Sequence, residues 1–240
     1  MSFMKRNLLL ISNSTLHGSG YLDHCADEIT KFLGNIKTIL FVPYARPSGM
    51  THDEYTKIAK DRFQKIGITL TGIHEFPNPR EAVKNAEAVF IGGGNTFVLL
   101  SNLYKSGVMD EIRKRVAEGM PYIGTSAGSN IACKSVKTTN DMPIMYPPSF
   151  DALNLVPFNI NPHYLDPNPD SKHMGETRET RINEFHFYND EYVVGLREGA
   201  MLFVADNKIM LKGTTGARIF KNGQEAKEYK PGDSLDFLLK

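Results

Sequence analysis

The sequence predicts a single α/β domain built on a mostly parallel sheet, and two observations point to this architecture. Short apolar runs recur through residues 1–135 without the alternation of a half-exposed strand, and amphipathic stretches of helical length separate them. Strands that are buried on both faces and joined by helices are typical of a parallel sheet covered on both sides. Residues 1–240 contain no internal repeat and no low-complexity linker, so we assign them to one domain.

Five apolar runs in the first part of the chain predict strands, and four amphipathic segments between them predict helices. The expected strands are residues 8–11, 38–42, 68–71, 88–91 and 122–124. The expected helices are residues 22–33, 52–65, 96–104 and 108–118. Ligands bind at the carboxyl ends of the strands in such sheets. A site is therefore expected in the loops that follow the strands, at residues 12–20, 43–49, 92–95 and 124–128.

Prolines interrupt the chain from Asp141 onward, and they stand at positions 143, 147, 148, 157, 162, 167 and 169. Because proline breaks helices and central strands, this part predicts a long shaped loop. The regular elements expected here are a short strand near residues 158–160 and a helix over 176–187. Further strands are expected at residues 192–196, 200–204, 208–211 and 217–220, with a hairpin turn at 221–224.

Composition is that of an ordinary globular protein, with 41% hydrophobic residues, 23% charged residues and a net charge of +1. No basic stripe is present to bind nucleic acid. No apolar run approaches the roughly 20 residues of a membrane span, and the run at residues 8–11 is too short for a secretory signal. We therefore expect a cytoplasmic protein without nucleic-acid or membrane partners, in which Cys25 and Cys133 are reduced thiols.

The segment Gly124-Thr125-Ser126-Ala127-Gly128 matches the G-x-S-x-G pattern of a nucleophile elbow. A strand is expected before it and a helix after it, which is the context the pattern requires. The glycines allow a turn so sharp that Cβ atoms would collide, and the serine then projects its Oγ clear of the sheet. The following helix offers free N–H groups to a developing oxyanion. The alternative is a glycine-rich turn whose serine caps the helix.

A serine nucleophile needs a base, and three of the seven histidines follow Ser126 in the chain: His163, His173 and His186. His163 comes directly after an apolar, strand-like run, and Pro162 restricts the backbone before it. His173 lies in a polar loop, and His186 lies in a stretch expected to be helical. Position therefore favours His163 as the base.

Position leaves the acid open, since Asp141 and Asp151 precede His163 while Glu198 follows it in another expected strand-end loop. The oxyanion hole needs two N–H donors, and the residue after the nucleophile, Ala127, supplies one. The second is expected from the glycine-rich residues 92–95, whose backbone can approach a substrate closely. A phosphate-binding loop is the weaker interpretation of this segment, because it lacks G-x-G-x-x-G and the Walker lysine.

Six segments together resemble the peptidase E family of serine peptidases, the aspartyl dipeptidases, with cyanophycinase as a more distant relative. The segments are IGGGNTF (91–97), GTSAGSN (124–130), residues 141–143, NINPHY (159–164), GETRE (175–179) and GLREG (195–199). The resemblance covers nearly the whole chain. It implies a class I glutamine-amidotransferase-like fold, which is a three-layer α/β sandwich with a mostly parallel central sheet. It also implies hydrolysis of dipeptides with an N-terminal aspartate, without a metal or cofactor.

The resemblance further implies roles for individual residues. Ser126 matches the nucleophile, His163 the base and Glu198 the acid. Gly94 and Ala127 match the oxyanion donors, and Asp141 matches an aspartate of the family motif in a supporting role.

The aspartate side chain of such a substrate needs a charged donor, and the planar fork of arginine provides one. Arg178 is the residue that we expect to bind it, together with Asn95 or Thr96. The alternative is that Arg178 and Arg181 pair with the glutamates at positions 176, 179 and 184 on a solvated helix face.

Two other functions remain open at this point. One is a serine esterase that uses Ser126 and His163 with Asp141 or Asp151. The other is a non-catalytic small-molecule sensor of the same fold. A glutamine amidotransferase would carry cysteine at position 126. The expected partner is an Asp-X dipeptide, and a homodimer is left open.

Overall fold

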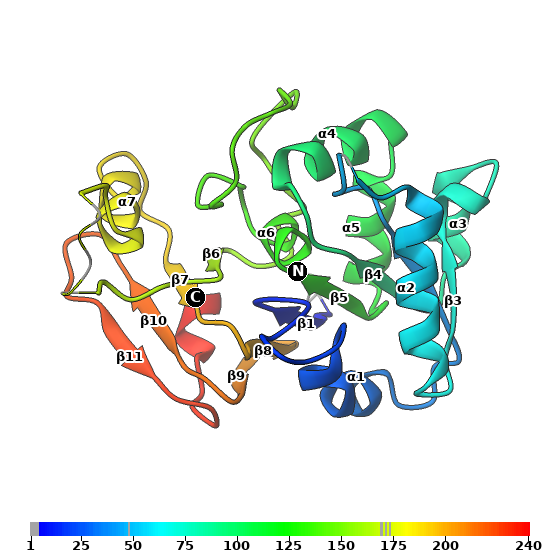
Figure 1. Cartoon of the computed structure of the whole chain (residues 1–240), viewed down its shortest axis with the longest axis horizontal. Helices are drawn as coiled ribbons and strands as arrows, with labels where there is room; N and C mark the ends of the chain where they lie inside the picture. Colours follow the sequence, from blue (N-terminus) through cyan, green and yellow to red (C-terminus); the bar gives the residue numbers. More distant parts are fainter. Residues whose placement is uncertain (1–4, 48, 169, 171, 173) are drawn as a thin grey trace.

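Seven strands form the central sheet, in the order β3-β2-β4-β5-β1-β8-β9. The computed structural model describes residues 5–47, 49–168, 170, 172 and 174–240. The first five strands run parallel, and β8 and β9 add an antiparallel edge (Figure 1). Their bounds are β1 Asn7–Ile11, β2 Thr38–Val42, β3 Thr69–Gly72, β4 Val89–Ile91, β5 Tyr122–Thr125, β8 Ala200–Ala205 and β9 Lys208–Gly213. The five strands expected in the first part of the chain are therefore confirmed.

Six helices accompany this sheet: α1 Ala26–Leu33, α2 His52–Gln64, α3 Pro79–Asn85, α4 Thr96–Ser106, α5 Met109–Ala117 and α6 Ala127–Ala132. The helix expected over 22–33 begins with a 3-10 turn, η1 Asp23–Cys25, before α1. The helix α3 and the 3-10 turn before it, η2 Ile73–Glu75, were not expected from the sequence. Within the described residues, no helix is long and apolar enough to cross a membrane.

Alternate side chains of the central strands point to opposite faces, and each face has its own helices. Leu9 and Ile11 of β1 pack with residues of α1 and α2 on one face. Leu8 and Leu10 pack with residues of α3, α4, α5 and α6 on the other. Because every central position is covered, the strands lack the polar alternation of a half-exposed sheet. The expected three-layer α/β sandwich is confirmed.

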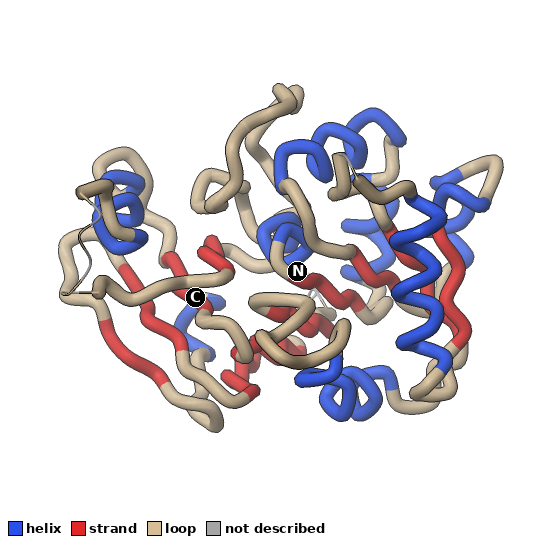
Figure 2. Tube along the Cα trace, viewed as in Figure 1, coloured by secondary structure: helices blue, strands red, loops and turns tan. Residues whose placement is uncertain are grey.

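A second, four-stranded sheet lies beside the sandwich in the order β11-β10-β7-β6, with α7 packed near it (Figure 2). Its elements are β6 Asn159–Pro162, α7 Arg178–Phe185, β7 Val193–Leu196, β10 Ala217–Phe220 and β11 Lys227–Tyr229, and the chain ends in the turn η3 Asp236–Leu239. The strands expected in the last part of the chain thus divide between two sheets. Residues 197–199 carry the chain from β7 in the small sheet to β8 in the large one.

Candidate active site

The nucleophile elbow has the strained geometry that its glycines suggest. Ser126 follows β5 and has a φ of 52°, in a region that residues with a Cβ rarely adopt. A Cβ at Gly124 would lie 2.6 Å from the carbonyl oxygen of Gly128, and a Cβ at Gly128 would lie 2.1 Å from that of Ile91. The Ser126 side chain makes no capping hydrogen bond to α6. The alternative of a helix-capping serine is therefore wrong.

Ser126, His163 and Glu198 come together in one line of contacts. Ser126 Oγ lies 2.9 Å from His163 Nε2. His163 Nδ1 lies 2.6 Å from Glu198 Oε1. All three residues stand where the two sheets meet: Ser126 after β5, His163 after β6, and Glu198 between β7 and β8. The arrangement has the geometry of a nucleophile, a base and an orienting acid.

Three of the remaining candidates, His173, His186 and Asp141, are engaged elsewhere or fall outside the described residues. His186 is buried, and its Nε2 lies 3.0 Å from the carbonyl oxygen of Glu191. His173 lies outside the described residues. The carboxylate of Asp141 accepts the N–H of Thr96 at 2.7 Å at the start of α4, whereas His163 Nδ1 contacts Glu198.

The glycine-rich loop after β4 lies against the nucleophile. A Cβ at Gly93 would be 3.1 Å from both Ser126 Cβ and the Thr125 carbonyl oxygen, so glycine allows the loop to pack this closely against Ser126. Gly94 has a φ of 146°, and its backbone is held because Asn95 N–H donates to the Ala45 carbonyl at 2.8 Å. Within the part of the chain that the structure describes, the N–H groups of Gly94 and Ala127 donate to no protein acceptor. Both are free to receive an oxyanion.

Asn95 and Thr96 have their polar groups engaged within the protein. Asn95 Oδ1 caps α4 by accepting from the N–H groups of Phe97 and Val98 at 3.1 Å, and Nδ2 donates to the Met142 carbonyl at 2.9 Å. Thr96 is fully buried, and its Oγ1 accepts from Thr139 at 3.0 Å. These contacts fix the loop that contains Gly94 and join it to the segment of Asp141 and Met142.

Arg178 is the first residue of α7, and it has no carboxylate partner among the described residues. Glu176 pairs with Arg181 at 3.7 Å and Glu179 pairs with Arg218 at 3.2 Å, and the carboxylate of Asp141 acts on the charge of Arg178 without forming an ion pair with it. Partial burial and the neighbouring charge of Arg181 lower the pKa of Arg178. A pocket of about 380 Å³ lies between Arg178 and the loop that follows His163. The alternative in which Arg178 pairs with its own helix is therefore not realised.

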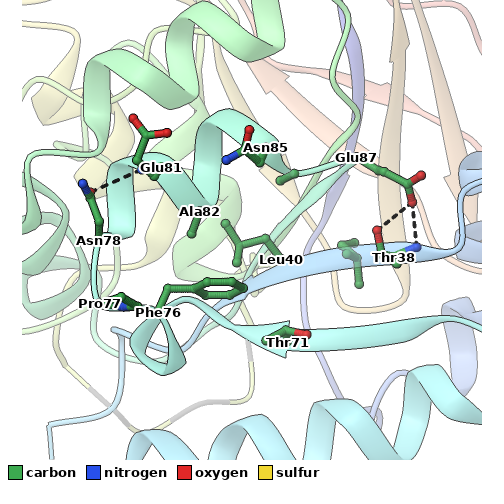
Figure 3. Close-up of a pocket in the computed structure, with 12 residues that line it drawn as sticks. Thr38, Leu40, Thr71, Phe76, Pro77, Asn78, Glu81, Ala82, Asn85 and Glu87 are labelled. Carbon is green, nitrogen blue, oxygen red and sulfur yellow. Dashed lines mark hydrogen bonds between the residues drawn. The ribbon is translucent and has the colours of Figure 1, made fainter.

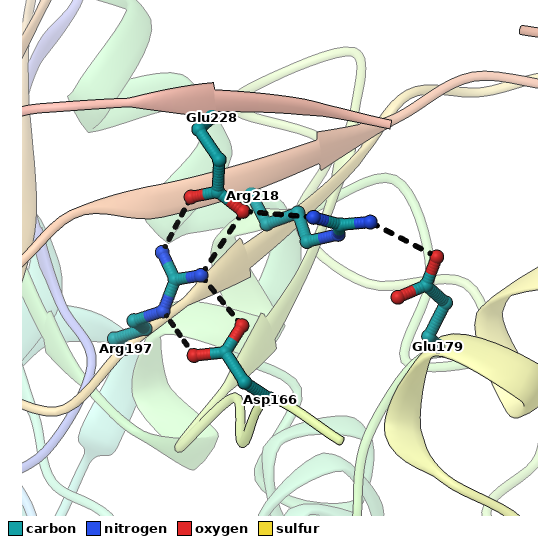
Figure 4. A network of polar contacts seen from close by, with 5 residues as sticks. All are labelled: Asp166, Glu179, Arg197, Arg218 and Glu228. Atoms are coloured by element: carbon teal, nitrogen blue, oxygen red, sulfur yellow. Dashed lines mark hydrogen bonds and ion pairs between the residues drawn. The ribbon is translucent and has the colours of Figure 1, made fainter. Parts of the chain in front are cut away.

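Five charged side chains, one of them next to Glu198 in the chain, form a network of ion pairs and hydrogen bonds (Figure 4). Its centre is Arg197, which donates two hydrogen bonds to Asp166 at 2.7 and 2.6 Å and two to Glu228 at 2.9 and 3.1 Å. Arg218 extends the network from Glu228 to Glu179 on α7. Asp166 follows His163 by three residues and Arg197 precedes Glu198, so the network ties both segments to the hairpin of β10 and β11.

Sequence reasoning missed two residues at the end of β1 that contact the same segments. Ser12 bonds to the backbone of His163, and Asn13 bonds to the backbone of Gly199 beside Glu198. The only signal for them was their place in the loop 12–20, which follows a strand of a parallel sheet.

A separate pocket of about 300 Å³ lies between α3 and the strands β2 and β3 (Figure 3). Leu40, Phe76 and Ala82 give it an apolar lining. The carboxylate of Glu87 at its rim accepts from Thr38 N–H at 2.9 Å and from Thr38 Oγ1 at 2.6 Å. None of the residues expected to form the site lines this pocket.

Comparison with known proteins identifies the family. The model of "Peptidase family S51" matches residues 8–212, which contain Ser126, His163 and Glu198. The chain belongs to peptidase family S51. This S51 chain is 49% identical over 237 residues to the "Probable alpha-aspartyl dipeptidase" of Drosophila melanogaster, with 98% of each chain covered. It is 50% identical over 233 residues to "Peptidase E" of Streptomyces coelicolor, covering 97% of this chain and 95% of the relative.

The fold of this S51 chain also occurs among solved structures. A peptidase from an acI-B1 Actinobacterium superposes with a TM-score of 0.74 at 17% identity, with 98% of each chain covered. At this identity the match concerns the fold alone, and it agrees with the three-layer sandwich. The resemblance to the peptidase E family that the six segments carry is confirmed.

Proposed function

We propose that this chain is a serine dipeptidase that removes an N-terminal aspartate from Asp-X dipeptides through an acyl-enzyme. The contact between Ser126 Oγ and His163 Nε2 at 2.9 Å, in an S51 family member, carries the proposal. Relatives at about half identity over nearly the full chain are named peptidase E and alpha-aspartyl dipeptidase, which supports the choice of substrate.

Both ring nitrogens of His163 take part in acylation, Nε2 toward Ser126 and Nδ1 toward Glu198. Ser126 Oγ attacks the carbonyl carbon of the aspartyl residue, and its proton passes to His163 Nε2. The carboxylate of Glu198, which accepts from His163 Nδ1, orients the ring and stabilises its charged form. The oxyanion of the tetrahedral intermediate accepts hydrogen bonds from the N–H groups of Gly94 and Ala127. As the C–N bond breaks, His163 gives its proton to the leaving amine of residue X.

Deacylation repeats these steps with water as the nucleophile. His163 Nε2 takes a proton from water while the water oxygen attacks the ester carbonyl. The second intermediate collapses, the ester bond to Ser126 Oγ breaks, and the proton on His163 returns to that oxygen. Free aspartate leaves and the enzyme regains its starting state, so no other reactant is consumed.

Arg178 is our candidate for binding the aspartate side chain. Its guanidinium has no carboxylate partner among the described residues, and a partly buried arginine of this kind can form a bidentate pair with a carboxylate. Asn95 and Thr96 were expected to share this role. Because their polar groups are engaged within the protein, we propose that they act indirectly by fixing the Gly94 loop, with Asp141 supporting them through Thr96.

The test compares hydrolysis of aspartyl-p-nitroanilide and leucyl-p-nitroanilide by the wild type and by Ser126→Ala. We expect the wild type to cleave the aspartyl compound alone, and Ser126→Ala to lose about 10³-fold or more of that activity while keeping its fold. Circular dichroism and a melting curve for both proteins control for misfolding.

The two other functions give different results in the same assay. An esterase would hydrolyse p-nitrophenyl esters without preferring an aspartyl group. A sensor would bind an aspartyl compound in calorimetry without turnover. Failure of well-folded wild type to cleave the aspartyl anilide and an Asp-X dipeptide would overturn the proposal.

A further inference from the structure

The end of β1 contacts every segment that contributes to the Ser-His-Glu arrangement. The strand runs beside β5 in the middle of the large sheet, and its last residue is Ile11. The Ile11 carbonyl accepts the N–H of Ser126 at 3.0 Å, which holds the nucleophile in its strained turn. The next two residues, Ser12 and Asn13, are both fully buried although both are polar. Buried polar side chains in proteins have partners, so their contacts indicate their role.

Ser12 bonds to the segment that carries the base. Its Oγ accepts the N–H of His163 at 2.9 Å and donates to the Leu196 carbonyl at 2.8 Å. The same Leu196 carbonyl accepts the N–H of Tyr164 at 3.1 Å. His163 has a φ of 51°, a conformation that persists in a non-glycine residue only when its surroundings hold it. Ser12 thus supplies a contact to the backbone of the strained residue itself.

Asn13 bonds to the segment that carries the acid. Its Oδ1 accepts the N–H of Gly199 at 2.8 Å, directly after Glu198. Its Nδ2 donates to the Thr15 carbonyl at 3.0 Å, which fixes the orientation of the amide. The Glu198 carbonyl itself accepts from Thr215 Oγ1 at 2.6 Å. Both polar groups of the peptide between Glu198 and Gly199 are therefore held, although the Glu198 carboxylate is half exposed.

We propose that Ser12 and Asn13 are positioning residues, which set the distance from His163 to Ser126 and from Glu198 to His163 by fixing the backbones of the base and acid. This inference rests on the proposed function. Neither side chain touches the substrate in this scheme. Three consecutive residues, the last residue of β1 and the two that follow it, then align the nucleophile, the base and the acid.

The first experiment compares Ser12→Ala with Ser135→Ala on aspartyl-p-nitroanilide. Ser135 is a matched control: it is also buried, and its Oγ accepts a hydrogen bond from Asn159 at the start of β6, four residues before His163. We expect Ser12→Ala to lower kcat about 10- to 100-fold with KM nearly unchanged, because a small displacement of the base affects the chemical step. Ser135→Ala should keep the kcat of the wild type. Ser12→Thr retains the hydroxyl and should restore most of the loss.

A second comparison addresses the acid. Asn13→Ala is expected to lower kcat in the same manner. Asn159→Ala is the control, since it removes another buried amide oxygen that accepts a hydrogen bond from a backbone N–H. We expect Asn159→Ala to leave kcat unchanged. A readout without turnover accompanies both comparisons. The imidazole N–H proton between His163 and Glu198 should give a far-downfield NMR resonance in the wild type and both controls, and the resonance should shift or broaden in Ser12→Ala and Asn13→Ala.

The outcomes separate this inference from the function on which it rests. An active wild type with an inactive Ser126→Ala, together with Ser12→Ala and Asn13→Ala of normal kcat and unchanged imidazole resonance, would overturn the inference alone. Equal losses of kcat in Ser135→Ala and Asn159→Ala would also overturn the inference, because removal of any buried polar side chain would then lower kcat. An inactive wild type would overturn the proposed function, and the NMR comparison would still test the alignment of His163 and Glu198.

Discussion

Glu198 is about half exposed, yet one of its oxygens lies 2.6 Å from His163 Nδ1. We expect Glu198→Gln to lower kcat by roughly 10²–10⁴-fold, because an amide neither stabilises the charged imidazole nor selects the correct tautomer. The measurement is kcat on aspartyl-p-nitroanilide, with Asp151→Asn as the control. If Asp151→Asn or Asp141→Asn abolished activity while Glu198→Gln kept it, another acid would serve the base.

Arg178 and Arg181 lie one turn apart on α7 and make a matched pair for testing specificity. We expect Arg178→Met to lower kcat/KM for aspartyl-p-nitroanilide about 10- to 100-fold, since a lost charge-assisted hydrogen bond costs about 1.5–3 kcal/mol. Arg181→Met, which removes a loose pair with Glu176 at 3.7 Å, should have little effect. An unchanged preference for aspartyl over leucyl substrate in Arg178→Met would assign the carboxylate to another residue.

The turn between β5 and α6 has no room for side chains at Gly124 and Gly128, because the backbone at these two positions packs directly against neighbouring backbone. We expect Gly128→Ala to lose activity and to destabilise the protein by at least about 1–3 kcal/mol, since its Cβ would lie 2.1 Å from the Ile91 carbonyl oxygen. Urea unfolding and kcat measure the two effects. Gly223→Ala is the control: it adds a Cβ at a positive φ of 70° into open space, and it should cost about 1 kcal/mol without changing kcat.

The Arg197 network joins the loop after β6, the end of β7 and the hairpin of β10 and β11. The hydrogen bonds from Arg197 lower the pKa of Asp166. A carboxylate with a lowered folded-state pKa stabilises the fold above its unfolded value of about 3.9, and this contribution is lost as pH falls through the folded-state pKa.

Arg197→Met should therefore be less stable than the wild type at pH 7, and the difference should shrink below about pH 4. Urea unfolding at pH 7, 5 and 3 measures this difference. Lys57→Met is the control, since its pair with Asp61 is largely exposed and should contribute little at any pH. A difference that stayed constant down to pH 3 would argue against a contribution from the ionised Asp166.

The molecule as a whole shields both of its thiols. Cys25 and Cys133 are free and buried, and burial raises the pKa of Cys25 to about 12 and that of Cys133 further. Neither is a ready thiolate. We expect both to react with Ellman's reagent only as fast as the protein unfolds, so that labelling rises with the urea transition. Rapid labelling of one thiol in buffer would reveal local opening of the core that contains it.

Much of the fold was predictable because the strands of the large sheet are short apolar runs with helices between them. The helix α3 was missed although Asn78 caps it and Pro79 opens it, because its seven residues give too short a periodic signal. The division of the last strands between two sheets was not predictable. It depends on pairing between distant segments, such as β1 with β8, which periodicity does not encode.

The sharp turn at Ser126, our candidate nucleophile, was predictable because its motif is local, whereas the rest of the candidate site depends on distant contacts. Position favoured His163 but left three acids open, and the family resemblance favoured Glu198. Ser12 and Asn13 carry no motif at all, since a serine and an asparagine after a strand are ordinary loop residues. Their contacts with the segments of His163 and Glu198 form only when residues 151 and 186 positions away fold against them.

The segment 197–199, which passes from β7 to β8, has a consequence for the chain during its synthesis. Because translation proceeds from the N-terminus, a nascent polypeptide presents its serine and histidine well before Glu198 leaves the ribosome. Glu198 lies between β7, which pairs within the small sheet, and β8, which pairs with β1 in the large sheet. Under the proposed mechanism, full activity therefore requires a nearly finished polypeptide, and a product of premature termination before this crossing would lack the acid.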